Sequence, residues 1–228
     1  MGLGGRAWPD VPAATLLVPV GSCEQHGPHL PLDTDTRVAT AVARRAAGDD
    51  PALLVAPPLA YGASGEHEAF AGTLSIGHDA LSVVLVELGR SAARWAPRLV
   101  FVNGHGGNLP TVPDAVVQLR AEGRDAAWWP CAVAGGDAHA GRTETSILLA
   151  LDPAAVRTAA AAPGATAPLD ELLPAMRAGG VAAVSPNGVL GDPTGASAEE
   201  GERLLAEMTV ALRARVARWR PAPTGRLT

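Results

Sequence analysis

Short apolar runs alternate with longer amphipathic segments along most of the chain. The runs are apolar on both faces, as strands inside a parallel sheet are, and they predict strands over residues 16–20, 53–56, 99–102 and 127–133. The longer segments repeat apolar positions every three or four residues, and they predict helices over residues 37–47, 80–95, 111–122, 142–151 and 198–219. The alternation indicates βαβ units and hence an α/β fold with a mostly parallel sheet.

Two stretches lack either periodicity. Residues 159–168 are rich in Ala, Pro and Gly and predict a mobile connection, while residues 184–193 predict a turn-rich loop. We expect the tail, residues 221–228, to be frayed. The length and the lack of internal repeats favour a single domain over residues 1–228.

The composition narrows the range of functions. Apolar residues make up 47% of the chain and charged residues 18%, which is typical of a globular protein. No apolar run approaches the roughly 20 residues of a membrane span, and the N-terminal residues lack the features of a secretory signal. We therefore expect a cytoplasmic protein with no membrane partner. Cys23 and Cys131 are too few for a disulfide framework and are interpreted as thiols.

The charge balance excludes further classes of protein. A formal net charge of −5 argues against a nucleic-acid binder, which would carry a basic stripe, and favours a small or peptidic partner. All 18 basic residues are arginine. Without lysine the chain can form neither a Schiff base nor the lysine contact of a phosphate-binding P-loop.

Acidic and histidine side chains follow two of the predicted strands and precede one predicted helix. Glu24, His26 and Asp35 come after the first strand, and His105 follows the third in a glycine-rich segment. Glu144 stands at the start of the fourth helix. In an open parallel sheet, the loops beyond the carboxyl ends of the strands meet at one edge. We therefore expect these five side chains to lie together, although they are far apart in sequence.

Carboxylate and imidazole ligands in this mixture suit zinc, iron(II) or manganese. Five ligands are too many for one tetrahedral catalytic site with an open position. Two cations roughly 3.5 Å apart can share them and hold a bridging hydroxide as the nucleophile. The predicted chemistry is therefore hydrolysis of an amide-like bond. Asp35 is the first candidate for the carboxylate that bridges the two cations, and Asp33 is the alternative.

The other histidines have different expected roles. His139 lies five residues before Glu144. It suits either a metal ligand or a proton donor to the leaving nitrogen, and we favour the donor. His139 and Glu144 are thus the candidate catalytic residues. His29 and His78 are interpreted as structural.

Three segments resemble the signature motifs of the creatininase family of metal-dependent amidohydrolases. They are Glu24-Gln25-His26-Gly27-Pro28-His29-Leu30-Pro31, Asn103-Gly104-His105-Gly106-Gly107-Asn108 and His139-Ala140-Gly141-Arg142-Thr143-Glu144-Thr145-Ser146, with Asp35 after the first. The resemblance implies a three-layer α/β/α fold with a dinuclear metal centre, opening of a small or cyclic amide, and a homo-oligomer. By motif it assigns the metal ligands as Glu24, His26, Asp35, His105 and Glu144, and it places His139 near the substrate.

Further segments resemble the mycofactocin-system members of this family: residues 30–37, 61–67, 72–77 and 185–195. This resemblance implies a peptidase that releases a modified C-terminal Val-Tyr dipeptide from a ribosomal precursor peptide. It also implies two divalent cations per subunit, iron(II) or zinc, with manganese as a further option. Creatininase itself carries Tyr and Glu where this chain has Gly106 and Gly107, which argues against creatinine hydrolysis. The alternatives are a creatininase-type enzyme acting on a free cyclic amide and a non-catalytic metal-bound scaffold.

Four residues are candidates for contacts with the substrate. Ser64 and His67 lie in one short segment, whose sequence lacks the final glycine of a serine-hydrolase nucleophile elbow. Trp128 could form an aromatic wall with Tyr61 and Trp129, although aromatic residues at strand positions are more often core. Arg142 suits a carboxylate partner, with a solvated arginine at the helix start as the competing interpretation.

Overall fold

Four parallel strands form the centre of the protein, in the order β2-β1-β3-β4. The computed structural model describes residues 2–109 and 111–228. The strands are β1 (Thr15–Val20), β2 (Leu53–Val55), β3 (Arg98–Asn103) and β4 (Ala126–Pro130). β1 pairs with β3 along its whole length, from Thr15 opposite Arg98 to Val20 opposite Asn103. The predicted α/β class with a mostly parallel sheet is confirmed.

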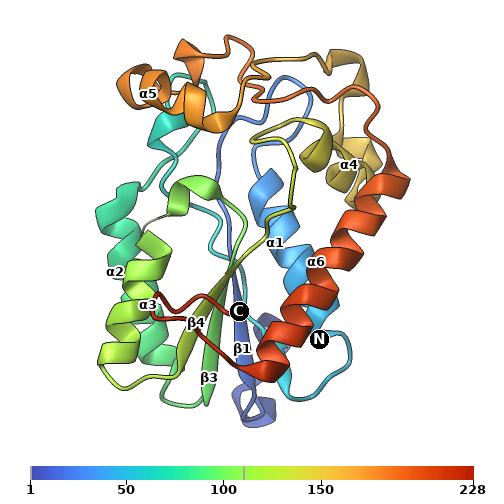
Figure 1. Ribbon diagram of the computed structural model, residues 1–228. Helices are drawn as coiled ribbons and strands as arrows, with labels where there is room; N and C mark the ends of the chain where they lie inside the picture. Colours follow the sequence, from blue (N-terminus) through green and yellow to red (C-terminus); the bar gives the residue numbers. More distant parts are fainter. Residues whose placement is uncertain (1, 110) are drawn as a thin grey trace.

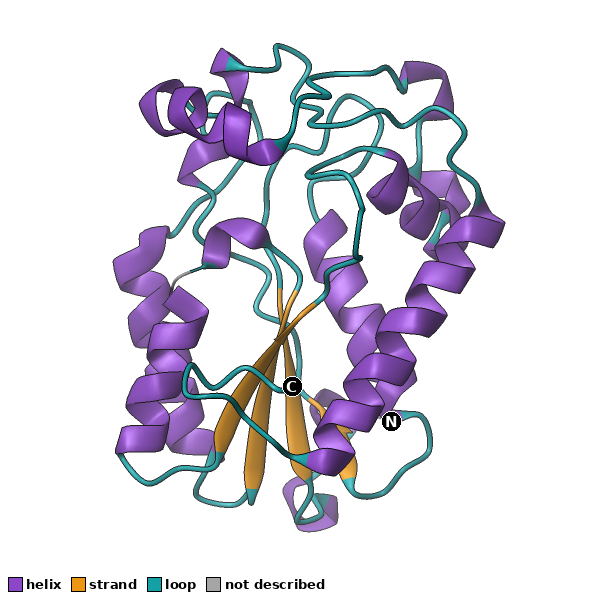
Figure 2. Ribbon diagram, in the orientation of Figure 1, coloured by secondary structure: helices purple, strands orange, loops and turns teal. Residues whose placement is uncertain are grey.

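Helices cover both faces of this sheet. They are α1 (Thr34–Ala47), α2 (Gly77–Ala92), α3 (Thr111–Ala121), α4 (Arg142–Leu151), α5 (Leu169–Gly179) and α6 (Ala198–Arg218). Helices α2 and α3 lie on one face, and α1, α4 and α6 lie on the other, as Figure 1 and Figure 2 show. The three-layer α/β/α arrangement is thus confirmed, with α5 among the loops beyond the upper ends of the strands (Figure 1).

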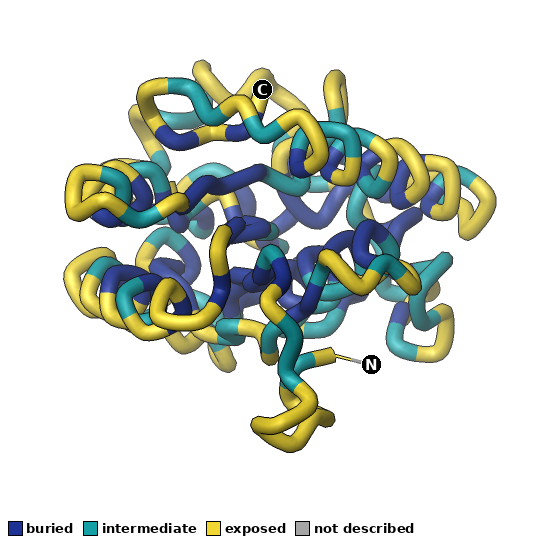
Figure 3. Tube along the Cα trace, turned by 90° about the horizontal axis from the view of Figure 1, so that it is seen from below, coloured by how far each residue is buried: buried dark blue, intermediate teal, exposed yellow. Residues whose placement is uncertain are grey.

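The side chains of each strand alternate between two apolar cores. Leu17 and Val100 belong to the core under α1, α4 and α6. Val18 and Phe101 belong to the core under α2 and α3. Viewed from below, buried positions run through the middle of the molecule between the exposed outer turns of the helices (Figure 3). Because both faces of the sheet are covered, the strands are apolar at successive positions.

Several element boundaries differ from those predicted. Helix α1 begins at Thr34, earlier than expected, so that Asp35 lies in its first turn. Helix α2 both begins and ends earlier than expected, and β4 ends at Pro130. Helix α5 is missing from the prediction because Pro174 inside it interrupts the helical pattern.

The C-terminal tail is held against β4, so the expected fraying of residues 221–228 is wrong. The indole Nε1 of Trp128 donates to the carbonyl of Thr224 at 2.9 Å. The N–H of Leu227 donates to the carbonyl of Trp128 at 3.0 Å, and Leu227 is only 2% exposed. β4 is an edge strand, and the tail satisfies hydrogen-bonding groups that this edge would otherwise leave open.

The strand order reverses at β1, which has β2 on one side and β3 on the other. β1 leads through α1 to β2 on one side, and β3 pairs with β1 on the other side. Such a reversal of strand order opens a space where loops from neighbouring strands meet. The motif-bearing segments after β1, β3 and β4 all begin at this edge. Among the described helices, none is long and apolar enough to cross a membrane. Cys23 and Cys131 are both unbridged, as predicted.

Candidate metal centre

Seven acidic and histidine side chains converge beyond the carboxyl ends of β1, β3 and β4. They form three overlapping groups with metal-ligand spacing: Glu24, His67 and His139; His26, His139 and Glu144; and Glu24, Asp35 and His105. All are buried except Glu144, whose side chain is 22% exposed. The structure thus brings together the five ligands expected from the sequence. It adds His139 and His67, of which His67 was expected only as a substrate contact.

Two glycines allow the strand ends to approach the start of α1 closely. A Cβ atom added at Gly104 would lie 2.5 Å from the backbone oxygen of Asp35, and one at Gly21 would lie 2.6 Å from the backbone nitrogen of Thr36. No side chain fits at either position without moving the helix. Glycine at the ends of β1 and β3 therefore lets the first turn of α1, with Asp35, lie against the ends of these strands.

Asp35 lies between the two halves of the cluster. Its Oδ1 atom is 3.2 Å from His26 Nε2, and its Oδ2 atom is 3.1 Å from His105 Nδ1. The hydroxyl of Ser22 donates to Oδ2 at 2.7 Å and fixes the carboxylate. One oxygen toward each histidine is the geometry of a bridging carboxylate. Asp33, the alternative, lies outside the cluster with a side chain 50% exposed, and it pairs with Arg37 at 2.7 Å.

Glu24 is the clearest sign that this cluster could hold a cation. Its side chain is fully buried, and neither carboxylate oxygen has a hydrogen-bond partner among the described residues. His67 Nε2 and His105 Nε2 face these oxygens at 3.3 and 3.1 Å. A buried carboxylate without a hydrogen bond costs several kcal/mol. A cation coordinated by Glu24 would remove this cost.

The histidine tautomers are set by backbone carbonyls. His26 Nδ1 lies 3.2 Å from the carbonyl of Glu24 and directs its proton there, while Nε2 lies 3.2 Å from Asp35 Oδ1. His139 Nε2 lies 2.8 Å from the carbonyl of Gln25, so its Nδ1 carries the lone pair. Nδ1 of His139 is 3.8 Å from Glu24 Oε1. Carbonyl groups orient metal-binding histidines in this way in many metal sites.

The side chain of Gln25 orients a second histidine. Its Oε1 accepts from the N–H of Gly27 at 2.8 Å. Its amide nitrogen donates to the carbonyl of Gly188 at 3.0 Å and to His67 Nδ1 at 2.8 Å. His67 consequently carries its proton on Nε2, which lies 3.3 Å from Glu24 Oε1 without the geometry of a hydrogen bond.

The buried charges shift the pKa values of the site in opposite directions. Burial alone lowers the pKa of His26, but the charge of Asp35 outweighs it and raises this pKa to about 10. Burial and the nearby His26 hold the pKa of His139 well below its usual range. Burial raises the pKa of Glu144 to about 7; the charge of His26 opposes this shift and that of Asp35 adds to it. Burial also raises the pKa values of Glu24 and Asp35, but the charges of His105 and His26 outweigh it; they lower the pKa of Glu24 to about 2 and hold that of Asp35 well below its usual range. Carboxylates that stay ionised when buried favour a cation beside them.

The ion-pair partners support the same conclusion. Among residues 2–109 and 111–228, every ion-pair partner of Glu24, Asp35 and Glu144 is a histidine. No arginine therefore compensates these three carboxylates in the described part of the chain. Buried carboxylates need a cation or proton to offset their desolvation, and the mixture of oxygen and nitrogen donors fits zinc, iron(II) or manganese.

Of the residues expected to contact the substrate, some lie beside the cluster and others pack elsewhere in the protein. Ser64 is fully buried beside the cluster, with Oγ 3.5 Å from His105 Nε2. Trp128 is 6% exposed and belongs to the core under α2 and α3, so its expected substrate contact is wrong. Arg142 donates from Nε to Glu200 Oε2 at 2.7 Å, so its carboxylate partner is part of the chain. Tyr61 is 51% exposed, and Trp129 lies in the opposite core.

The histidines interpreted as structural lie outside the three groups. His29 is fully buried, with Nε2 2.9 Å from the hydroxyl of Thr145. His78 Nδ1 lies 2.7 Å from the hydroxyl of Thr111. Both therefore tie two segments of the chain together. Sequence reasoning considered Glu66 only within the serine-hydrolase pattern around Ser64 and did not propose it as a ligand, because an acidic residue in a polar turn carries no spacing signal of its own. Its Oε1 lies 3.6 Å from His105 Nε2.

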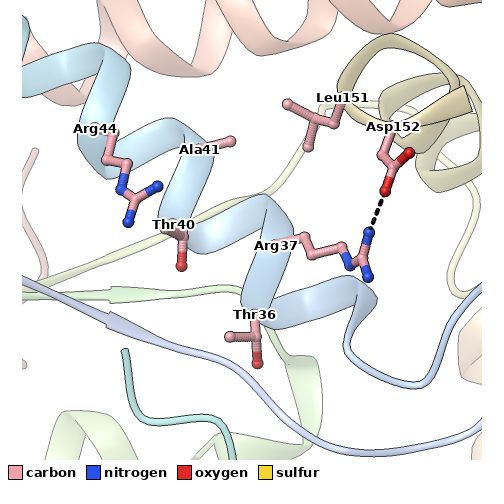
Figure 4. A pocket seen from close by; sticks show the side chains of 7 residues that line it. All are labelled: Thr36, Arg37, Thr40, Ala41, Arg44, Leu151 and Asp152. Atoms are coloured by element: carbon pink, nitrogen blue, oxygen red, sulfur yellow. Dashed lines mark hydrogen bonds and ion pairs between the residues drawn. The ribbon is translucent and has the colours of Figure 1, made fainter. Parts of the chain in front are cut away.

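A pocket of about 380 Å³ on the flank of α1 is separate from this cluster. Its lining includes Arg37, Thr40, Arg44 and Asp152. Figure 4 shows Arg37 bound to Asp152, and the two groups are 2.8 Å apart. None of the seven clustered side chains lines this pocket, so we assign it no part in the chemistry.

Curated proteins with similar sequences align with 60–97% of this chain. The chain is 61% identical to the mycofactocin precursor peptide peptidase of Mycobacterium ulcerans (strain Agy99), over 97% of this chain and 90% of that protein. It is 60% identical to the protein of the same name from Mycolicibacterium smegmatis (strain ATCC 700084 / mc(2)155), over 93% of this chain and 88% of that protein. The creatinine amidohydrolase of Pseudomonas putida is 34% identical over 60% of this chain and 64% of its own length.

Solved structures of creatininases share the fold. A manganese creatininase superposes with a TM-score of 0.78 at 28% identity and covers 96% of this chain and 98% of its own. A Zn-Zn form of the E122Q mutant creatininase superposes equally well, at 27% identity. The sequence also matches the family Creatininase (creatinine amidohydrolase) over residues 6–216. The protein therefore belongs to the creatininase family of hydrolases.

Proposed function

We propose that this protein is a metal-dependent peptidase of mycofactocin biosynthesis. Its reaction is hydrolysis of a peptide bond in a modified ribosomal precursor peptide, with release of the C-terminal Val-Tyr dipeptide. The substrate is supported by 60–61% identity to relatives named mycofactocin precursor peptide peptidase. The chemistry is supported above all by the fully buried Glu24 carboxylate, which makes no hydrogen bond and faces only histidines, since a cation would offset its desolvation.

Two cations fit the cluster. Glu24, Asp35 and His105 would hold one, while His26 and Glu144 would hold the other and share Asp35. Such a pair of ions lowers the pKa of a bound water and so supplies a hydroxide nucleophile at neutral pH. Iron(II), zinc and manganese all accept these ligands. The metals named for related structures, Mn and Zn, fall within this set.

His139 is suited to move the proton during cleavage. Its Nε2 proton donates to the carbonyl of Gln25, which leaves the Nδ1 lone pair directed at Glu24. Its lowered pKa leaves the imidazole neutral, with the Nδ1 lone pair unprotonated. Nδ1 takes a proton from the attacking water and delivers it to the leaving nitrogen, which would otherwise depart as an unstable anion.

His139 also lies within ligand distance of two groups. Replacing it separates the two roles. A His139→Ala variant that keeps both cations but loses cleavage supports proton transfer, whereas loss of a cation supports ligation.

The decisive experiment is mass spectrometry of the products after metal-loaded protein has been incubated with the modified precursor peptide. We expect release of the C-terminal dipeptide, its loss on chelation and its return when a divalent cation is added. His105→Ala should lose metal and cleavage together. His78→Ala is the matched control, because His78 contacts Thr111 and lies outside the cluster.

Three results would overturn the proposal. Turnover of a free cyclic amide alone would favour a creatininase-type enzyme. Tight peptide binding without cleavage would favour a metal-bound scaffold. Unchanged metal content and cleavage in His105→Ala would refute the site itself.

We further infer one catalytic domain over the chain, since a single sheet with its two helix layers includes most of its elements. A homo-oligomer and a cytoplasmic location are our expectations for this enzyme. The exposed Trp8, 87% accessible beside the partly exposed Trp95, is consistent with a subunit contact. Light scattering on the purified protein gives the oligomeric state directly.

A further inference from the structure

Glu66 faces the candidate metal centre from a short turn outside the three motifs. It lies in a 3₁₀ turn over Gly65–His67. Its Oε1 atom is 3.6 Å from His105 Nε2, and this same nitrogen lies 3.1 Å from Glu24 Oε2. Two carboxylates from different loops therefore approach one ring nitrogen.

The missing side chain at Gly107 makes room for the Glu66 carboxylate. A Cβ atom added at Gly107 would overlap Glu66 Oε1 and His105 Nε2 and would lie 2.7 Å from the carbonyl of Ala63. On its other side the backbone of Glu66 is held closely, because a Cβ atom at Gly180 would lie 2.7 Å from the Glu66 carbonyl. The Glu66 carboxylate thus fills the space that a side chain at position 107 would otherwise take.

The surroundings of Glu66 lack a fixed positive charge. Its side chain is 29% exposed, and its one ion-pair partner among residues 2–109 and 111–228 is His105. Within that part of the protein the Glu66 carboxylate accepts a hydrogen bond only from its own backbone N–H, whereas Glu68, two residues later, is exposed to solvent. A mostly buried carboxylate needs a cation to offset its desolvation. The position of Glu24 across His105 Nε2 shows where such a cation would lie.

We propose that Glu66 is a further carboxylate ligand of the cation held by Glu24, Asp35 and His105. Gly107 and Glu66 then act as a pair, in which the glycine leaves the coordination position open and the glutamate fills it from the neighbouring turn. The inference rests on the proposed function only because both require metal in this cluster. It adds a ligand that none of the three sequence motifs contains.

Metal binding by Glu66→Gln tests this assignment. The variant keeps the shape of the side chain and removes its charge, and Glu68→Gln is the matched control in the same turn. Both proteins are loaded with Co²⁺, and bound metal is measured by elemental analysis, by visible absorption and by competition with a chelator. We expect one of the two metal sites in Glu66→Gln to bind Co²⁺ at least about 10-fold more weakly than in the wild type. Its cobalt absorption bands should also change in intensity, because the coordination number falls.

Glu68→Gln should match the wild type in all three measurements. Thermal melting shows whether each variant is folded, and Glu66→Ala serves as a second variant with the same expected loss. Equal affinity and identical cobalt spectra in the Glu66 and Glu68 variants would overturn the assignment.

Different results would contradict the proposed function and the proposed role of Glu66. A wild-type protein that binds two cations without cleaving the peptide contradicts the peptidase function alone. Normal metal binding by Glu66→Gln in a protein that cleaves the peptide contradicts the role of Glu66 alone.

Discussion

The close approach of Gly104 to α1 leads to the sharpest prediction for this site. The Cβ atom of Gly104→Ala would lie 2.5 Å from the backbone oxygen of Asp35 and 3.2 Å from the Cβ of Ala39. Ordinary contact begins at 3.4 Å, so the first turn of α1 must retreat by about 0.9 Å, the difference between 3.4 and 2.5 Å. This turn carries the Asp35 carboxylate, whose two oxygens lie 3.2 and 3.1 Å from His26 and His105.

The displacement should reduce both stability and catalysis. Overpacking of this kind costs about 1–3 kcal/mol, which corresponds to a fall of roughly 2–12 °C in melting temperature for a chain of this size. A misplacement of about 1 Å in a catalytic group lowers the rate by about 100-fold. We therefore expect Gly104→Ala to melt earlier, to bind its cations less tightly and to cleave the peptide about 100-fold more slowly.

Differential scanning calorimetry, elemental analysis and peptide cleavage measure these three effects. Gly106→Ala is the control in the same segment, because a Cβ atom there meets nothing within 4 Å, and it should keep its melting temperature and metal content. If Gly104→Ala behaves like Gly106→Ala, the contact between the end of β3 and α1 does not position Asp35, and the reasoning is wrong.

The remaining predictions concern the bridging carboxylate, the tail and a surface ion pair. Asp35→Asn should lose at least one cation by elemental analysis and more than about 100-fold of the cleavage rate, and retention of both cations would exclude a bridging role. Leu227→Ala should lower the free energy of unfolding in urea by about 2–5 kcal/mol, whereas a frayed tail would give no change. Arg90 lowers the pKa of Glu122 from 4.5 to about 2, so the stabilisation by Glu122 is present above pH 4.5 and disappears as the pH falls toward 2. The destabilisation caused by Glu122→Gln should therefore shrink over this pH range, and a constant difference between the two proteins would contradict the ion pair.

Much of the fold follows from the sequence, because strands covered on both faces must be apolar at successive positions. Leu17 and Val18 point to opposite cores, yet both positions are apolar, and this pattern predicts a parallel sheet without any knowledge of packing. The same logic extends to the site. Loops after neighbouring parallel strands meet at one edge, so His26 and His105 are predictable neighbours although they are distant in the chain.

The local pattern fails where long-range contacts decide the outcome. The sequence allows the tail to be frayed, but the open edge of β4 and a buried place for Leu227 hold it. Trp128 is compatible with a pocket wall or with core, and only the packing of α2, α3 and the tail around it decides for core.

By itself, then, the sequence determined the fold class, the edge of the sheet at which the loops meet, and the acidic and histidine side chains expected there. Hydrophobic patterning and the placement of these residues after strands depend on local residue choice. Tertiary structure alone decided which of two aspartates two residues apart enters the site. Helix α1 begins at Thr34, and its first turn directs Asp35 inward while Asp33 remains at the surface with Arg37. It also brought Glu66 to His105, since the distance between two loops depends on backbone packing around glycines that no local pattern records.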